Sequence, residues 1–355
     1  MKKSLLIAGL ACVALAACTK NEVVSVAPDQ EITFQTLSTK ADPTVGFNIN
    51  NVFYSYAYYL APGLSWDSSA ESATEYIRNS TISFDSGRGV WKNADNTYYW
   101  PKQGSLTFFA WTDNTTSPEI QGSGASVSCN KTTGIQFTDY SVKDNQNRDL
   151  MVAKIAAGKT ANDGTGHTDP ENSRTWASGV PTDFKRVLSK VVFNVVTEED
   201  YSSDVTIKVK SIKLKNVKHK GTYTQPLAST ADPRQLSAWA NESDQTELPV
   251  YTNASGFTVT KTSQNLDPAP SDYYIVLPQT LEAGMQLELV YEYTTNYGVS
   301  FTQTFTESPE LTGIYTASWE PGKKYTLNIT FRLNEILWDP TVEDWDTGTT
   351  QDITL

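Results

Sequence analysis

The chain has 355 residues, of which 28 are basic and 40 are acidic, so its formal net charge at pH 7 is −12. So acidic a chain is poorly suited to a nucleic-acid partner, because binding to phosphate backbones depends on lysine and arginine. A hydrophobic content of 39% and a mean hydropathy of −0.40 are typical of a folded globular body, and the length suggests two domains of ordinary size.

The N-terminus has the layout of a secretory signal. Met1–Lys3 is short and basic, residues 5–15 are apolar or small, and Leu15-Ala16-Ala17-Cys18 closes the segment. The apolar run is too short to count as a membrane-spanning helix. The closing residues resemble a bacterial lipobox, which implies cleavage after residue 17 and lipid on Cys18. We therefore expect a precursor that is anchored to the outer membrane through this lipid alone and exposed on the cell surface.

Cysteine content restricts the chemistry of the mature chain. Cys12 would leave with the signal and Cys18 would carry the lipid, so Cys129 would be the remaining thiol. Neither an intramolecular disulfide nor a Cys-x-x-Cys metal site is then expected.

Alternation of apolar and polar residues predicts strands in most of the chain. Ile32 and Phe34 alternate with polar neighbours, and residues 106–111 are apolar on both faces. Residues 205–214 alternate but slip by one position, which predicts a β-bulge near Ser211. Similar strand patterns cover residues 187–196, 285–293 and 325–333. A single helical turn is predicted near residues 68–76, and the chain as a whole is predicted to be all-β, built from β-sandwiches.

The longest polar stretch, residues 157–181, suggests a boundary near Asp183. The expected division is a signal peptide (1–17), a lipidated N-terminal segment with a strand (18–40), a first sandwich (41–183) and a second sandwich (184–355). A long loop inside one domain would have the same composition, so both interpretations stay open.

No arrangement of residues predicts an enzyme. His167 and His219 lack the serine, cysteine or carboxylate companions of a triad or a zinc site, and both are predicted to face solvent. The acidic residues of 144–149 and 344–346 lack the spacing of a calcium loop. We therefore predict no catalytic residue, no metal and no cofactor.

Six segments, taken in order, resemble the fimbrillin family of Bacteroidales, the type V pilins. They are EITF at 31–34, YYWP at 98–101 with LTFFAW at 106–111, DLMVA at 149–153, VLSKVVF at 187–193, YIVLPQ at 274–279, and WEPGKKY at 319–325 with WDP at 338–340 and VEDW at 342–345. The resemblance implies two transthyretin-like β-sandwich domains in tandem. It also implies a structural subunit of a cell-surface fimbria that serves adhesion.

In such pilins a trypsin-like protease removes an N-terminal segment that includes a strand, and a strand of a neighbouring subunit fills the groove left behind. The resemblance therefore implies that Ile32 and Phe34 belong to a removable strand and that cleavage occurs between Lys40 and Ala41. Lys20 and Lys40 are the basic residues between Cys18 and the first domain. The alternative is an uncut strand that belongs permanently to the first sheet.

The C-terminal residues have two interpretations. Apolar side chains recur in an otherwise polar segment and make a plausible donor strand: Ile336, Trp338, Val342, Trp345, Ile353 and Leu355. Residues 336–345 would instead close their own domain if they form its last strand, which would leave only the residues beyond Asp346 free.

The expected partners are other fimbrial subunits, the processing protease and a receptor on a host or bacterial surface. A second function is a surface lipoprotein that captures glycans, or a tip or anchor adhesin that does not polymerise. The aromatic residues Trp66, Trp91, Trp100 and Trp111 favour this second reading, because aromatic faces stack on sugars, although such residues also build β-sandwich cores.

Overall fold

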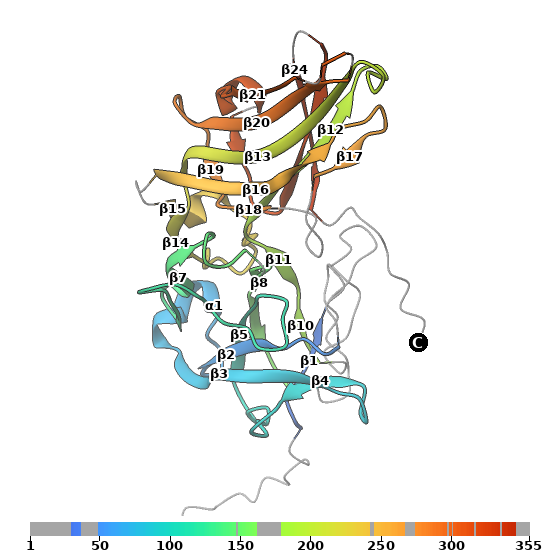
Figure 1. Cartoon of the computed structure of the whole chain (residues 1–355). Helices are drawn as coiled ribbons and strands as arrows, with labels where there is room; N and C mark the ends of the chain where they lie inside the picture. Colours follow the sequence, from blue (N-terminus) through green and yellow to red (C-terminus); the bar gives the residue numbers. More distant parts are fainter. Residues whose placement is uncertain are drawn as a thin grey trace, which may run out of the picture.

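The computed structural model describes residues 30–36, 49–146, 148–161, 179–241, 245–266, 274–296, 298–299, 301–315, 317–333 and 336–345. The structure is almost entirely β, which confirms the predicted fold class. Two β-sandwiches follow one another along the long axis of the molecule, the N-terminal one below and the C-terminal one above in Figure 1.

The N-terminal sandwich is built on a nine-stranded sheet. Its strands are β1 (Thr33–Thr36), β2 (Phe53–Leu60), β3 (Thr74–Asp85), β4 (Val90–Asn93), β5 (Ser105–Thr112), β8 (Met151–Ala153), β9 (Ala156–Lys159), β10 (Val180–Thr182) and β11 (Phe184–Arg186). Their order is β10-β1-β4-β3-β2-β5-β8-β11, and β9 pairs with β5. As predicted, β5 is buried on both faces.

This sheet curls back on itself. β10 and β11 stand at opposite ends of the strand order, yet only Asp183 separates them in the chain. β10 pairs with β1 and β11 pairs with β8, so the two edges meet along one stretch of chain. The curled sheet encloses a core of its own: Ile32, Phe34, Phe53, Ala57, Ile77, Ile82, Trp91, Leu106, Phe108, Ala110, Met151, Ala153, Ala156, Val180 and Phe184.

A four-stranded sheet covers the outer face of the curled sheet. It contains β6 (Ser126–Asn130), β7 (Gly134–Ser141), β14 (Lys220–Thr224) and β15 (Trp239–Asn241), in the order β15-β14-β7-β6. Trp111 of β5 packs edge-on against Phe137 of β7, with ring centroids 5.4 Å apart. Two strands from beyond residue 183 therefore complete the N-terminal sandwich, and the proposed division between residues 183 and 184 stays a prediction about folding units.

The C-terminal sandwich packs a four-stranded sheet against a five-stranded one. The first contains β13 (Val205–Lys218), β16 (Gln245–Thr258), β20 (Gln286–Thr295) and β21 (Thr302–Glu307), in the order β16-β13-β20-β21. The second contains β12 (Ser189–Thr197), β17 (Gln264–Asn265), β18 (Tyr274–Val276), β23 (Lys323–Phe331) and β24 (Ile336–Asp344), in the order β17-β12-β23-β24 with β18 on β12. A small ladder joins β19 (Gln279–Thr280) to β22 (Ser318–Trp319).

The pairing of β13 shifts register between Val209 and Ser211 against both of its neighbours, which confirms the predicted bulge. The predicted helical turn corresponds to α1 (Trp66–Ser69) and a 3-10 turn (Ala70–Ser72), after which β3 begins. The other short helix is α2 (Leu311–Ile314). Among the described residues, no helix is long and apolar enough to cross a membrane.

His219 differs from its prediction. Its side chain is 8% exposed, so it is buried rather than solvated. It lies between β13 and β14, where the chain passes from one sandwich to the other, and its carbonyl oxygen accepts a hydrogen bond from the Val142 N–H at 2.9 Å. The alternation of apolar and polar residues around His219 did not reveal this burial. The chain passes between the two sandwiches at this point, so both of its faces are covered. His167 lies outside the described residues.

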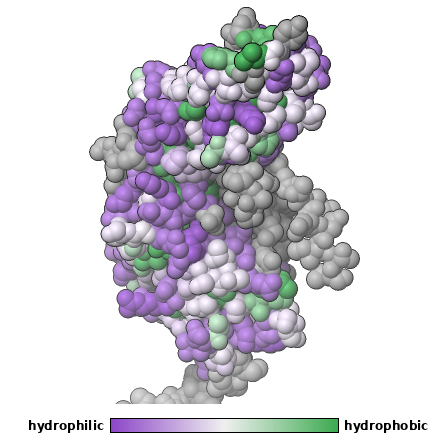
Figure 2. Space-filling model, in the orientation of Figure 1, coloured by the Kyte–Doolittle hydropathy of each residue, from purple (hydrophilic) through white to green (hydrophobic). Residues whose placement is uncertain are grey.

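The visible surface is mostly hydrophilic or neutral, with hydrophobic atoms gathered at the upper end of the molecule (Figure 2). The β20–β21 and β23–β24 hairpins turn at this end (Figure 1). Three strongly exposed apolar residues belong to these turns: Val299 (91%), Phe301 (62%) and Leu333 (59%). The turns at this end therefore expose large apolar side chains to solvent.

Candidate functional site

β1 is held by backbone pairing along both of its sides. It runs parallel to β10, with Phe34 opposite Val180, and antiparallel to β4. Just before the strand, the Ile32 N–H donates a hydrogen bond to the Tyr98 carbonyl at 2.8 Å. β1 is thus an interior strand, and its removal would leave unpaired backbone groups on β4 and β10. We call the space that β1 fills between these strands the β1 groove.

Phe34 of β1 and Ile32, which immediately precedes the strand, are both part of the core of the curled sheet. Ile32 is fully buried and Phe34 is 2% exposed. The Phe34 ring meets the rings of Phe53 and Phe108 edge-on, with centroid distances of 5.7 and 5.8 Å. Burying an aliphatic or aromatic side chain of this size contributes about 1.5–3 kcal/mol, and a well-placed aromatic pair adds about 0.5–1.5 kcal/mol. Two side chains thus anchor a very short strand.

A glycine allows the backbone of β1 to approach its neighbour closely. Gly179 has a φ of +109°, and a Cβ atom at this position would lie 2.8 Å from the carbonyl carbon of Phe34. A side chain there would both strain the backbone and collide with β1. At the solvent side, Glu31 pairs with Arg88 at 2.5 Å; because both side chains are partly exposed, this pair adds little stability.

β1 is tied covalently to the rest of the sheet only through residues 37–48. Lys40 and Ala41, the predicted cleavage position, fall in this stretch, which lies outside the described residues, as does Cys18. Lys40 is the single basic residue of 37–48. One cut after it would therefore separate a buried, fully paired strand from the body of the protein.

β24 forms the last strand of its own domain in this structure. It pairs antiparallel with β23 along its whole length and lies at the edge of the sheet. Ile336 and Trp338 are half-buried, and Val342 is 53% exposed. Whether this strand also acts as a donor stays a prediction, and Ile353 and Leu355 lie outside the described residues.

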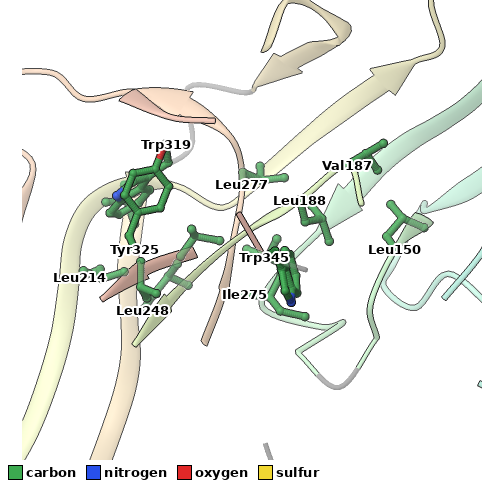
Figure 3. Packing of buried hydrophobic residues seen from close by; sticks show 14 of the residues in the cluster. Leu150, Val187, Leu188, Leu214, Leu248, Ile275, Leu277, Trp319, Tyr325 and Trp345 are labelled. Carbon is green, nitrogen blue, oxygen red and sulfur yellow. The ribbon is translucent and has the colours of Figure 1, made fainter. Parts of the chain in front are cut away.

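Trp345 fastens the end of β24 to the junction between the sandwiches. Trp345 is 5% exposed, and its backbone N–H donates a hydrogen bond to the Gly322 carbonyl at 3.0 Å. Figure 3 shows it in the hydrophobic cluster that also contains Leu188. The Arg186 Cζ atom lies 4.9 Å and the Lys190 Nζ atom 5.1 Å from the centroid of its ring, so two cations face one aromatic side chain.

These cations lie in a strongly shielded environment. The Arg186 Nε donates to the Asp149 Oδ2 at 2.7 Å, and both side chains are buried. Burial, together with the neighbouring charges of Arg186 and Lys324, lowers the pKa of Lys190 to about 8, while the carboxylate of Asp149 acts in the opposite direction. Arg186 thus serves the junction as the ion-pair partner of Asp149.

The polar cleft beside this junction does not resemble a catalytic centre. It measures about 520 Å³, and four of its five charged lining residues form ion pairs within it: Arg234 with Asp232 at 3.0 Å and Lys323 with Asp344 at 2.6 Å. In the part of the chain that the structure describes, no group of three histidine, cysteine or acidic side chains is placed to hold a metal ion.

Comparison with known proteins decides the family. The profile of the fimbrillin-like family matches residues 63–345, which is most of the chain. The chain belongs to the fimbrillin-like family. No curated protein matched the sequence. The proteins of this family are structural and not enzymes, so this fimbrillin-like protein is a fimbrial, cell-adhesion protein of the cell surface.

One solved structure among those that the chain resembles shares its fold clearly. A fimbrial protein from Bacteroides vulgatus superposes with a TM-score of 0.65 at 18% identity, covering 89% of this chain and 100% of that one. A candidate cell adhesion protein from Bacteroides uniformis gives 0.48 at 18% identity (90% and 100% covered), and the tip fimbrial protein Mfa3 from Porphyromonas gingivalis gives 0.37 at 11% (90% and 100%).

Sequence reasoning missed the residues that receive β1. Val180 pairs with Phe34, and Phe184 packs its ring 5.3 Å from that of Phe53. Val180 lies near the end of the polar stretch that suggested a linker, and Phe184 follows that stretch. The available signal was that Val180, Thr182 and Phe184 alternate with Pro181 and Asp183. So short a run that contains a proline is a weak strand pattern.

Proposed function

We propose that this fimbrillin-like protein is a structural subunit of a type V fimbria, assembled by strand exchange after cleavage between Lys40 and Ala41. The observation that supports this most is the position of β1. It is an interior strand with two fully buried side chains, yet it is joined to the body through one stretch with a single basic residue.

Removal of β1 would create a site for another strand. Ile32 and Phe34 would leave an apolar groove lined by aromatic rings, bordered by the unpaired edges of β4 and β10. A new strand would regain the backbone hydrogen bonds, and its alternate side chains would fill the groove. An open edge of this kind associates readily, so a covering strand keeps the precursor from assembling early.

Export precedes assembly in this proposal. The precursor is acylated on Cys18, carried to the outer membrane and cut there by a trypsin-like protease that accepts lysine. The cut separates the lipid from residues 41–355. The freed body then joins other fimbrial subunits, and the finished fimbria binds a receptor on a host or bacterial surface.

The donor comes from the C-terminal region of a neighbouring subunit. Residues 336–345 would have to leave β23, and Trp345 would have to leave the contacts with Arg186 and Lys190. The residues after Trp345, which include Ile353 and Leu355, would reach a neighbour without that cost.

The glycan-binding alternative receives little support from the aromatic residues that suggested it. Trp66, Trp91 and Trp111 are 3%, 6% and 1% exposed, so none presents a face to a sugar. Trp100 is half-buried and packs edge-on against Phe108, with ring centroids 5.7 Å apart. These side chains build the core.

The proposal is tested with Lys40→Ala in the cells that make the protein. We expect this variant to reach the surface but to form no high-mass, heat-sensitive ladders on gels, because β1 stays in its groove. Lys20→Ala is the matched control and should assemble normally, since it lies ahead of the strand. Normal ladders from Lys40→Ala would overturn cleavage at this position.

A further inference from the structure

We infer that the open edge of β21 is a docking site for a second copy of this chain, and that the two β21 strands pair antiparallel about a two-fold axis at Phe305. The contact lies on the C-terminal sandwich and uses neither β1 nor the residues after Trp345. It therefore joins two chains independently of strand exchange, in the uncut precursor as well as in the cut protein.

β21 borders its sheet and is open to solvent. Among the strands that the structure describes, it pairs with β20 alone. In Figure 1 it forms the upper border of its sheet, on the side away from the N-terminal sandwich. Five of its six residues are exposed, and the sixth, Phe305, is half-buried. A strand of another chain can therefore reach β21 along its whole length.

β21 lacks the features that usually keep a sheet edge from pairing. Natural edge strands are very short, or they are interrupted by prolines, lysines or bulges. β21 reads Thr-Gln-Thr-Phe-Thr-Glu and pairs with β20 without a register shift. The two longer edge strands contain Pro249 in β16 and Pro340 in β24, and the other edge strands that the structure describes have five residues or fewer. β21 is thus the described edge best suited to accept a strand.

The threonines of β21 direct their backbone groups toward this open edge. The carbonyl oxygens of Phe301 and Pro309, on either side of the strand, accept hydrogen bonds from β20. In an antiparallel ladder the residues that bond to a given neighbour alternate along the strand. Thr302, Thr304 and Thr306 therefore offer their N–H and C=O groups to a strand on the other side. Threonine and phenylalanine are also residues that favour strands.

The apolar side chains favour a second β21 as the partner. With the axis at Phe305, the two copies of this residue face each other in a pair without hydrogen bonds, where opposing side chains come closest. Each Phe305 ring stacks on Tyr291 of its own chain, with centroids 5.4 Å apart, so pairing would lengthen an existing row of rings. Phe301, which is 62% exposed, would face Pro309 of the second copy and lose contact with water.

The charges of β21 permit the same register. Glu307 is the one charged residue of the strand. With the axis at Phe305 it faces Gln303 of the second copy, whose amide can donate a hydrogen bond to the carboxylate. The two Glu307 side chains then lie four residues apart along the paired strands, or roughly 13 Å at about 3.3 Å per residue. This separation exceeds the screening length of about 8 Å at physiological salt, so their repulsion is weak.

The first test measures association of the uncut chain, which carries Lys40→Ala so that no strand exchange takes place. Because the contact is small, we expect a monomer–dimer equilibrium at roughly 1–100 μM in analytical ultracentrifugation. Thr304→Pro should be monomeric, since proline removes an N–H that points to the second copy and leaves the pairing with β20 intact. Thr304→Val is the matched control and should dimerise normally, because only an exposed side chain changes.

Two outcomes of this test would overturn the inference. One is an unchanged chain that stays monomeric over the whole range of concentration. The other is a Thr304→Pro variant that dimerises as well as Thr304→Val. Circular dichroism and the urea midpoint of Thr304→Pro show whether the variant is folded. If it is not, the charge variants described next decide the matter, because they change only exposed side chains.

The second test examines the register. Gln303→Glu places a carboxylate opposite Glu307 of the second copy and should weaken association about threefold to tenfold. The double exchange Gln303→Glu with Glu307→Gln restores one carboxylate opposite one amide, so it should restore the association. Ser255→Glu, at an exposed position on β16, adds the same charge away from the contact and should have little effect.

The charge variants also have outcomes that contradict the inference. Association of Gln303→Glu that equals that of Ser255→Glu would show that residue 303 lies outside the contact. A double exchange that stays as weak as Gln303→Glu would overturn the axis at Phe305. Neither result bears on strand exchange, because none of these variants changes β1, its groove or the C-terminal residues.

Discussion

Phe34 contributes more contacts to the first strand than its short length suggests. It is 2% exposed and meets two aromatic rings edge-on. We expect Phe34→Ala to lower the free energy of unfolding of the uncut chain by about 3–5 kcal/mol, because it removes a buried aromatic side chain and leaves a cavity. Gln35→Ala, next to it and half-buried, should cost far less. Urea titration of both variants measures the difference, and equal midpoints would contradict the packing described for β1.

Lys190 makes the junction sensitive to alkaline pH. Burial lowers its pKa from 10.5 to about 8 in the folded chain. Between these values the unfolded chain binds a proton that the folded chain has released, so the contribution of this lysine to stability rises with pH.

We therefore compare the unchanged chain with Lys190→Met between about pH 7 and pH 10.5. The free energy of unfolding of the unchanged chain, taken relative to that of Lys190→Met, should rise by on the order of 1–3 kcal/mol as the pH increases over this range. Lys208→Met, at a half-buried position on β13, is the control. Parallel pH profiles for the unchanged chain and Lys190→Met would contradict the shifted pKa.

At the residue scale the sequence indicated which side chains of β1 are buried but not what surrounds them. Alternation alone identified Ile32 and Phe34, because one face of a strand in a core must be apolar. Phe53, Phe108 and Phe184 come from three distant strands, and no local pattern states that they meet. The burial of His219 was missed for the same reason.

At the scale of elements, strands were more predictable than their partners. The bulge near Ser211 follows from a one-residue slip in the alternation, and burial of β5 on both faces follows from its unbroken apolar run. The parallel pairing of β1 with β10 joins residues about 146 positions apart, and such pairings leave no mark in local sequence.

Trp345 should control how firmly β24 is held. Its ring packs in the junction, and among the strands that the structure describes β24 pairs with β23 alone. We expect Trp345→Ala to raise the rate of amide hydrogen exchange in residues 336–344 well above that in β12, since local opening then needs less free energy. Val342→Ala, at a half-exposed position, should leave exchange nearly unchanged. Equal rates in the two variants would show that pairing with β23 alone fixes the strand.

At the scale of the whole molecule, the two sandwiches share strands and a core. β14 pairs with β7 of the N-terminal half and β15 pairs with β14, and one hydrophobic cluster contains Trp111, Phe137 and Tyr325. The sequence showed a polar stretch before residue 183 but not the later return of the chain, because β14 and β15 look like ordinary strands of the second half.

This sharing predicts that the N-terminal half does not fold by itself. A fragment of residues 30–186 would leave open the edge of β7 that pairs with β14. It would also lack the rings of Tyr223 and Trp239, which pack against Phe137 and Tyr140. We expect it to lack a cooperative unfolding transition, whereas the full chain shows one. Adding a peptide of residues 219–241 should restore the transition at least in part. A cooperative fragment without the peptide would mean that the boundary near Asp183 separates independent folding units.

The central claim is that assembled protein lacks the strand that fills its groove in the precursor. It is tested most directly by the intact mass and N-terminal sequence of the subunit in fimbriae isolated from native cells. The account predicts a chain that begins at Ala41 and carries no lipid. An assembled chain that keeps an acylated Cys18, with Ile32 and Phe34 still attached, would contradict it.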